Sequence, residues 1–166
     1  MKLLSQFKNR RPNPFGLVAL LLIACAYGFT LAPSITWSNG GTDSGELAAA
    51  VASAGIAHPP GYPTFVIVGI IWTRLLGFIE VALALNWLSA LSSVLAAACL
   101  LSLTRRYSPA TAAPISVIWG ALLFALAPLV WSQAILTEVY GLGVAFFALS
   151  TLAVVALLQQ PRPMRA

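Results

Sequence analysis

The sequence contains very little charge. Only 8% of its 166 residues are Asp, Glu, Lys or Arg, whereas charged residues make up roughly a quarter of a soluble domain. Hydrophobic residues account for 60% of the chain, and the mean hydropathy is +0.90. These values exclude an ordinary soluble domain. They predict an all-α, polytopic transmembrane helical protein.

Residues that carry chemistry are also scarce. The two cysteines, Cys25 and Cys99, lie inside apolar runs, and their spacing supports neither a disulfide nor a metal site. The chain has one histidine, four acidic residues and nine basic residues, for a net charge of +5. The bases lie in small clusters beside apolar runs, which indicates membrane topology and not a nucleic-acid partner.

The apolar runs predict about four membrane spans, since a span takes about 20 residues. We expect spans at approximately 15–35, 81–104, 111–130 and 139–158, with an external loop and interfacial helices over 36–80. The whole chain, 1–166, is treated as a single transmembrane domain. The segment 64–79 is ambiguous because it is short for a span and contains Arg74.

The positions of the charges favour one of two topologies. With four spans, every base except Arg74 faces the cytoplasm, as the positive-inside rule prefers. If 64–79 also crosses, the chain has five spans, and Arg105 and Arg106 face outward. Glu138 would then lie on the opposite face from Asp43. We prefer four spans, with both termini in the cytoplasm and the protein in the bacterial inner (plasma) membrane.

One polar stretch follows the first span. It contains Thr42–Glu46 and His58–Pro63, and with them two of the four acidic residues and the only histidine. Asp43 and Glu46 are three residues apart, so a helix places them on one face. A carboxylate at a membrane surface can act as a general base or hold a divalent cation through oxygen. The alternative for this pair is capping of a helix N-terminus, and for His58 it is an ordinary loop histidine.

Other polar residues belong to the same outer face under the four-span topology. Glu138 is the most informative of them, because an ionisable group near membrane depth indicates a functional site. Tyr140 follows it, in a position typical of an aromatic membrane belt. Arg74 either pairs with polar groups of the site or extends its charged end to the membrane interface.

Several short motifs occur in an order that resembles a bacterial membrane family long described only as one of unknown function. They are Asp43–Glu46, Gly55–Pro63, Asn86–Ala90, Trp131–Ala134 and Glu138–Tyr140. That family is similar to the protein O-mannosyltransferases of the GT-C superfamily, and the likeness covers approximately residues 33–150.

The resemblance implies an N-terminal GT-C-like module of a glycosyltransferase. Such an enzyme transfers a sugar, for example mannose, from a lipid-phosphate-linked donor to an acceptor hydroxyl at the outer membrane face. Asp43 is the implied base, and we expect Asp43 and Glu46 to be catalytic. The expected substrate-binding residues are His58, Tyr62, Gln133, Glu138, Tyr140 and Arg74. No cofactor or metal is identified, beyond a divalent cation that the carboxylates can hold.

The expected partners are membrane lipid, the lipid-linked donor, and a protein acceptor or partner subunit, but no nucleic acid. GT-C enzymes have many more spans, so we expect a truncated chain or one part of a split enzyme. The alternative function is a non-catalytic membrane subunit or lipid-binding helper. A transporter fragment is disfavoured, because the acidic residues cluster on one face and not at the membrane midplane.

Overall fold

The computed structural model describes residues 14–109 and 113–159. Within these residues the chain forms seven α-helices, one short 3-10 turn and no strand, so the all-α class is confirmed. In chain order the elements are α2 (Pro14–Thr30), η1 (Ser38–Gly40), α3 (Ser44–Ser53), α4 (Pro63–Leu75), α5 (Val81–Tyr107), α6 (Pro114–Ala125), α7 (Pro128–Ala134) and α8 (Val139–Leu158). The basic residues expected near the two termini lie outside the described residues.

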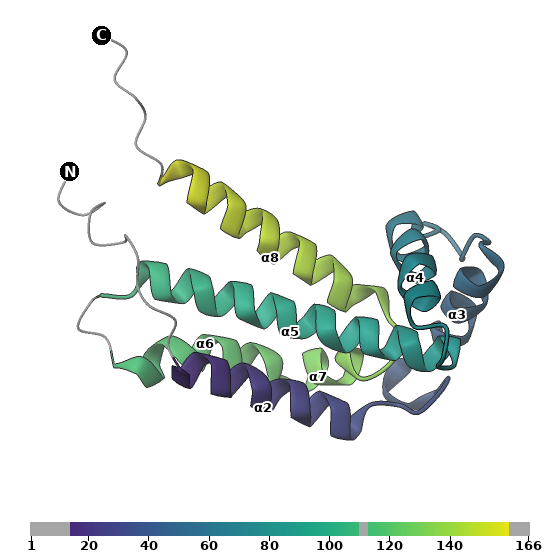
Figure 1. Cartoon of the computed structure of the whole chain (residues 1–166), viewed down its shortest axis with the longest axis horizontal. Helices are drawn as coiled ribbons and strands as arrows, with labels where there is room; N and C mark the ends of the chain where they lie inside the picture. The colour runs from purple at the N-terminus through teal and green to yellow at the C-terminus, as the bar shows by residue number, and fades with distance from the viewer. Residues whose placement is uncertain (1–13, 110–112, 160–166) are drawn as a thin grey trace, which may run out of the picture.

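The helices form a bundle that is organised around α5 (Figure 1). α2, α6 and α8 all pack along α5, and α2 also contacts α6. α2 and α6 run in one direction along the bundle, whereas α5 and α8 run back. α3 and α4 pack together at one end, beside the first turns of α5, and α4 runs across the direction of α5. The chain therefore passes back and forth through the bundle and returns repeatedly to the α3–α4 end.

Two of the helices are long and apolar enough to cross a membrane. They are α5, with 27 residues, and α8, with 20, which correspond to about 40 Å and about 30 Å of helix. A third candidate is the bent pair of α6 and α7. α2 and α4 are also apolar but shorter, with 17 and 13 residues. By length and composition the described residues contain two or three candidate spans.

The segment expected to span at 111–130 is interrupted. α6 ends at Ala125, α7 begins at Pro128, and the two helices are bent by 64°. Pro128 lacks a backbone N–H, and it disfavours a helical conformation at the residue before it, so the helix cannot continue straight. The Ala125 carbonyl instead accepts a hydrogen bond of 2.7 Å from the buried Tyr27 hydroxyl on α2. The carbonyl group at the break thus has its hydrogen-bond partner on a neighbouring helix, α2.

α2 ends at Thr30, earlier than the expected span end at residue 35. Pro33 explains the early end, because it removes a donor and disfavours helix at the preceding residue. The chain then runs irregularly, and the Ala32 N–H donates a hydrogen bond of 2.8 Å to the Ile135 carbonyl just after α7. The end of α2 is therefore joined directly to the end of α7.

A buried amide on α5 connects these irregular segments. The Asn86 side chain, 1% exposed, donates hydrogen bonds to the carbonyls of Ala32 (2.8 Å) and Ser34 (3.2 Å). Its oxygen accepts a 2.6 Å hydrogen bond from the Thr137 hydroxyl. Backbone groups buried away from water need such partners. Asn86 thus holds the segment after α2 and the segment before α8 against one helix.

α5 and α8 approach each other closely at Gly141. A Cβ atom built at this glycine would lie 2.8 Å from the Ser89 carbonyl oxygen and 2.9 Å from Ser93 Oγ. Two residues further on, a Cβ atom at Gly143 would meet nothing within 4 Å. Gly141 therefore allows the contact between the helices, whereas Gly143 lies beside open space.

We predict that Gly141→Ala destabilises the protein and that Gly143→Ala does not. The first change forces α8 away from the α5 backbone, and overpacking of this kind costs about 1–3 kcal/mol. The second only replaces glycine by a better helix former, which favours the helix by about 1 kcal/mol. Thermal unfolding of both variants in detergent micelles tests the prediction. Equal melting temperatures for the two variants would contradict it.

Candidate acidic cleft at one end of the bundle

The structure gathers the four acidic residues of the chain at the α3–α4 end of the bundle. Asp43 and Glu46 belong to the start of α3, while Glu80 and Glu138 directly precede α5 and α8. Arg105 and Arg106 lie in the last turn of α5, at the opposite end.

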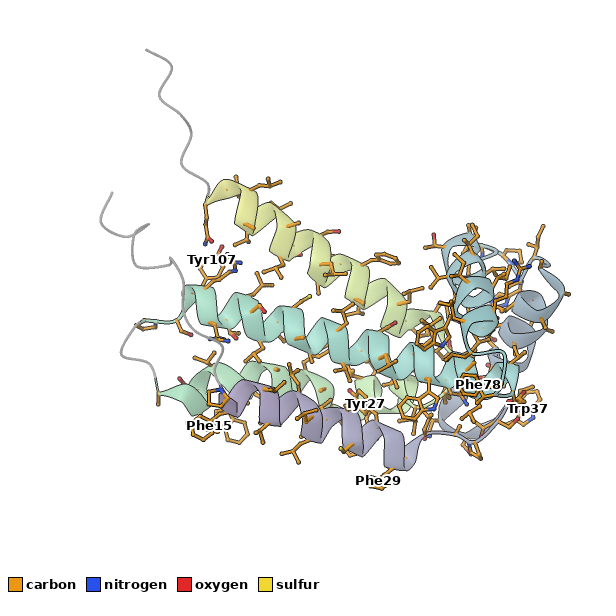
Figure 2. The ribbon with its side chains drawn as sticks, viewed as in Figure 1. Phe15, Tyr27, Phe29, Trp37, Phe78 and Tyr107 are labelled. Atoms are coloured by element: carbon orange, nitrogen blue, oxygen red, sulfur yellow. The ribbon has the colours of Figure 1, made fainter. Side chains whose placement is uncertain are left out.

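Exposed aromatic side chains mark both ends of the bundle. Figure 2 shows Trp37 and Phe78 near the α3–α4 end, and Phe15 and Tyr107 at the other. Tryptophan and tyrosine are enriched where a membrane meets water. The aromatic residues therefore fit a bundle whose two ends lie at the two membrane surfaces.

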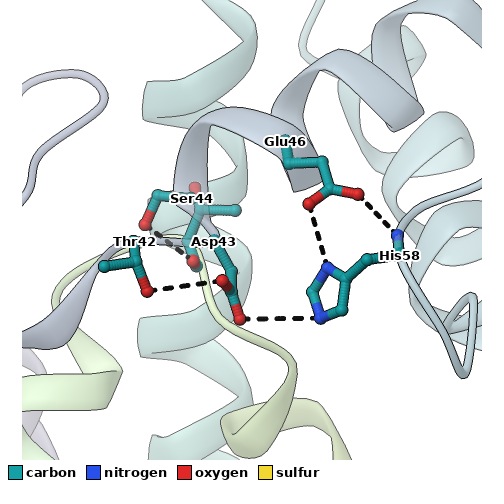
Figure 3. Close-up of polar contacts among 6 residues, drawn as sticks. Thr42, Asp43, Ser44, Glu46 and His58 are labelled. Atoms are coloured by element: carbon teal, nitrogen blue, oxygen red, sulfur yellow. Dashed lines mark hydrogen bonds and ion pairs between the residues drawn. The ribbon is translucent and has the colours of Figure 1, made fainter.

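His58 lies between the two carboxylates of the polar stretch (Figure 3). Its Nδ1 atom lies 2.9 Å from Glu46 Oε2, and its backbone N–H donates to the other Glu46 oxygen. On the far side of the ring, Nε2 lies 3.8 Å from Asp43 Oδ2. Glu46 thus fixes both the backbone and the ring of His58. The free ring edge faces Asp43.

Helix capping, the alternative for Asp43 and Glu46, is not what the structure contains. Asp43 is the residue before α3, but it has a near-helical backbone (φ −89°, ψ −11°), and its side chain caps no backbone N–H. An N-cap residue that accepts such a bond is typically extended. Asp43 Oδ1 instead accepts a 3.3 Å hydrogen bond from the Thr42 hydroxyl, and Glu46 binds His58.

The loop that carries His58 is held by a tight turn. The Gly61 N–H donates a 2.7 Å hydrogen bond to the His58 carbonyl, and Gly61 has φ +84°. Tyr62 follows with φ +41°, a left-handed conformation that is rare for a bulky residue and is often found at functional sites. This conformation places the Tyr62 ring edge-on to His58, with 5.4 Å between ring centroids.

A cleft of about 590 Å³ opens beside this cluster. Its polar lining comes from Thr42, Asp43, Ser93, Gln133, Glu138 and Tyr140. Gln133 also donates a 3.0 Å hydrogen bond to the Asn39 carbonyl, which joins α7 to η1. No lysine or arginine of the described chain lines the cleft. We call this space the acidic cleft.

Glu138 is the most deeply buried acidic residue of the cleft, with 3% of its surface exposed. The Ser89 hydroxyl donates to its carbonyl (3.1 Å) and accepts from its N–H (3.2 Å), so its backbone is fixed to α5. Burial, together with the negative charge of Asp43, raises the pKa of the Glu138 carboxyl to about 7. The Val139 N–H and the His58 ring act in the opposite direction. The side chain therefore keeps its proton to a higher pH than an exposed glutamate does.

A second cleft, of about 560 Å³, lies between the start of α4 and α8. Its lining is largely apolar and includes Pro60, Tyr62, Phe65, Val139, Tyr140 and Phe146. Tyr140 lines both clefts. We call the second space the apolar cleft. The two clefts thus adjoin each other at Tyr140 and Val144.

Seven of the eight expected site residues belong to this region, but Arg74 does not join them. Asp43, Glu46, His58 and Tyr62 form the cluster, and Gln133, Glu138 and Tyr140 line the acidic cleft. Arg74 is exposed in the last turn of α4 and lines neither cleft. Among the described residues, no group of three or more acidic, histidine or cysteine side chains is placed to hold a metal ion.

Sequence reasoning missed two serines of α5, Ser89 and Ser93. The first holds the Glu138 backbone and the second lines the acidic cleft. Their spacing after Asn86, three and then four residues, is the signal that could have revealed them. This spacing puts all three polar side chains on one face of an otherwise apolar helix.

An apolar helical bundle with two or three candidate membrane spans defines the class as a helical membrane protein. The sequence identifies the family more closely. The chain belongs to the family described as the N-terminal domain of the protein O-mannosyl-transferase TMEM260, whose family model matches residues 43–165. The matched region contains all eight expected site residues. The resemblance to protein O-mannosyltransferases, for the N-terminal portion only, is confirmed.

Two curated relatives carry the same description. The mouse protein O-mannosyl-transferase TMEM260 is 35% identical over 76% of this chain and 17% of its own length. The protein O-mannosyl-transferase tmem260 of Dictyostelium discoideum is 28% identical over 86% of this chain and 17% of its own length. The chain thus spans about a sixth of the length of these relatives. No solved structure matches it.

We predict that Glu138→Gln stabilises the protein in alkaline solution. The pKa of Glu138 is raised from 4.5 to about 7, so the folded protein holds this proton more tightly than the unfolded chain does. The stability that this provides is fully present below pH 4.5 and is lost as the pH rises through 7. Glutamine carries no charge at any pH, so the variant gains up to about 3 kcal/mol over the wild type above pH 8 and little at pH 5. Melting temperatures across this pH range measure the difference.

Glu80→Gln is the matched control for this prediction. Glu80 lies at the same end of the bundle but is exposed, and it accepts a 2.9 Å hydrogen bond from the Leu83 N–H. Its replacement also removes one negative charge. If both variants showed the same pH-dependent change in melting temperature relative to the wild type, burial of Glu138 would not be the cause of that change.

Proposed function

We propose that the chain is the N-terminal module of a GT-C-like membrane glycosyltransferase. It transfers a sugar, mannose by the name of its relatives, from a lipid-phosphate-linked donor to a hydroxyl of a protein acceptor at the outer membrane face. The observation that carries the proposal is the acidic cleft, in which Asp43 and the buried Glu138 line one space at the end of an apolar bundle. The names of the relatives support the reaction class and the acceptor.

The proposal includes four membrane spans, formed by α2, α5, the bent pair of α6 and α7, and α8. The back-and-forth course of these helices supports an even number of crossings. Asp43 and Glu138 line one cleft, whereas a fifth span would separate them. The crosswise direction of α4 supports an interfacial position. The positions of Arg105 and Arg106 support a cytoplasmic location for the end of the bundle opposite α3 and α4. The bacterial inner membrane is the proposed location.

In the proposed reaction, Asp43 is the general base. It takes the proton of the acceptor hydroxyl while the hydroxyl oxygen bonds to the anomeric carbon of the sugar. The bond between that carbon and the phosphate oxygen breaks, and its electron pair leaves with the lipid phosphate. Asp43 is suited to this role because Thr42 holds one of its oxygens and the other faces His58. Glu46 supports it indirectly by orienting His58.

The proposed donor approaches from the membrane side. The apolar cleft between α4 and α8 is suited to the first units of its hydrocarbon chain, and Tyr140 lies where that chain would meet the sugar. Gln133 and Tyr62 offer polar contacts near the two ends of this path. Arg74 lies outside both clefts, and its exposed position on α4 fits a contact with lipid headgroups.

We predict that Asp43→Asn lowers sugar transfer about 10²–10⁴-fold, the usual contribution of a general base. The asparagine keeps the size of the side chain but cannot accept the proton. Transfer of labelled mannose from a polyprenyl phosphate to protein is measured in membranes that contain the chain in its full-length context. Glu80→Gln, which removes an acidic side chain outside the cleft, is the control and should keep its activity.

Retained transfer by Asp43→Asn would contradict the role of Asp43. A wild-type protein that shows no transfer but copurifies with another membrane protein would instead support the alternative of a non-catalytic subunit or lipid-binding helper.

Cysteine labelling tests the proposed topology. In a background in which Cys25 and Cys99 are replaced by alanine, we expect single cysteines at positions 43 and 80 to react with an impermeant maleimide on intact spheroplasts. A cysteine at position 105 should react only after the membrane is permeabilised, because the four-span topology places it inside. Labelling of position 105 from outside would overturn that topology.

A further inference from the structure

The acidic cleft presents an electrostatic problem for the proposed donor. The phosphate of a lipid-linked sugar is negatively charged, and a phosphate site normally supplies positive charge or hydrogen-bond donors. No lysine or arginine of the described residues lines the cleft, but Asp43 and Glu138 do. If both carboxylates were ionised, each would repel the donor.

The surroundings of Glu138 suggest how the cleft avoids this repulsion. Glu138 is 97% buried, lines the cleft, and has its backbone fixed by Ser89. Within the described part of the chain, its carboxyl group makes no ion pair and no hydrogen bond to another side chain, and its one protein donor is the backbone N–H of Val139. A buried carboxyl without a cationic partner is favoured in its neutral form. In that form it carries an O–H donor.

We propose that Glu138 acts as a neutral carboxylic acid that donates a hydrogen bond to a phosphate oxygen of the lipid-linked donor, while Asp43 in the same cleft acts as the base. This inference rests on the proposed function and adds a role for Glu138 that charge alone does not reveal. Two carboxyl groups of one cleft thus perform opposite tasks, because one is buried and the other is partly exposed to water.

The step is balanced without any further reactant. The acceptor proton passes to Asp43, the new bond forms between the acceptor oxygen and the sugar carbon, and the old carbon–oxygen bond breaks. Its electron pair remains on the phosphate oxygen, where negative charge develops. The hydrogen bond from Glu138 stabilises that charge, and the proton of Glu138 stays on its carboxyl group. A donor aimed at developing charge lowers the barrier of such a transfer.

The groups that face Glu138 set the pH range of this role. Asp43 and burial raise its pKa to about 7, and His58 opposes them. Tyr140 is the other titratable side chain that lines the cleft. As the pH rises above 7, Glu138 loses its proton and changes from a hydrogen-bond donor into a second negative charge. Binding of a phosphate-containing lipid should therefore weaken with rising pH.

The binding experiment uses a phosphodiester probe, citronellyl phosphoryl mannose, with the chain in phosphatidylcholine nanodiscs. A phosphodiester keeps one charge over pH 5.5–8.5, so any pH dependence belongs to the protein. Wild-type affinity should fall above pH 7, by at most about tenfold per pH unit, as expected for one proton. Glu138→Gln mimics the neutral acid and should bind the probe equally at all these pH values.

Three controls sharpen the result. Glu138→Ala should bind weakly at every pH, since it has no donor. Asp43→Asn should move the pH midpoint of binding downward, because it removes the neighbouring negative charge. Citronellol, which has no phosphate, should bind without pH dependence. Wild-type binding of the probe that does not change with pH, or a Glu138→Gln variant that binds as weakly as Glu138→Ala, would overturn the inference.

A second measurement does not depend on a folded variant. The chain contains three glutamates, Glu46, Glu80 and Glu138, so selective ¹³C labelling of glutamate carboxyls gives three resonances. One of them should titrate near pH 7 in the wild-type protein, and a Glu138 carboxyl already ionised at pH 5.5 would refute its role. Neither measurement requires sugar transfer. Failure of the proposed function would appear as absent transfer with pH-dependent binding intact.

Discussion

Two irregular segments of this protein, the one after α2 and the one before α8, are held to α5 by the hydrogen bonds of one buried amide. Asn86 donates to two carbonyls that follow α2 and accepts from Thr137 just before α8. One turn further along α5, Ser89 holds the backbone of Glu138. Without these bonds, irregular backbone inside an apolar bundle would lack partners. The polar face of α5 therefore supplies hydrogen-bond partners to the two non-helical segments, and those segments carry polar side chains.

That constraint explains the arrangement of the two clefts. Asp43 lies on the segment between α2 and α3, whose first residues are held by Asn86. Glu138 lies just before α8 and directly follows Thr137, which is also bonded to Asn86. Ser44, next to Asp43, adds a direct link by donating a 3.0 Å hydrogen bond to the Thr137 carbonyl. The acidic cleft is thus built where two irregular segments converge on α5. The apolar cleft lies beyond Tyr140, where α4 and α8 contribute mainly hydrocarbon surface.

The sequence was sufficient to predict some helices of the bundle, but not the break in one helix or the contacts within the site. The pattern at 81–104 and 139–158 predicted α5 and α8 to within a few residues, because long apolar runs between polar flanks leave little alternative. The break between α6 and α7 was missed, although Pro128 lies inside the expected span and explains it. The contact between Glu46 and His58 was also not predictable, because the two residues are 12 positions apart and their contact depends on the path of the loop between α3 and α4. The roles of the site residues remain predictions.

The contrast between α5 and α8 has a consequence for how the protein enters the membrane. α8 packs mainly on α5 and exposes most of its apolar surface, so it can reside in lipid before it finds a neighbour. α5 instead carries Asn86 and Ser89, whose polar groups have their partners in the segments around α2 and α8. Helices of the first kind insert independently, whereas those of the second kind are completed by association. Assembly of the bundle and formation of the acidic cleft are therefore one event.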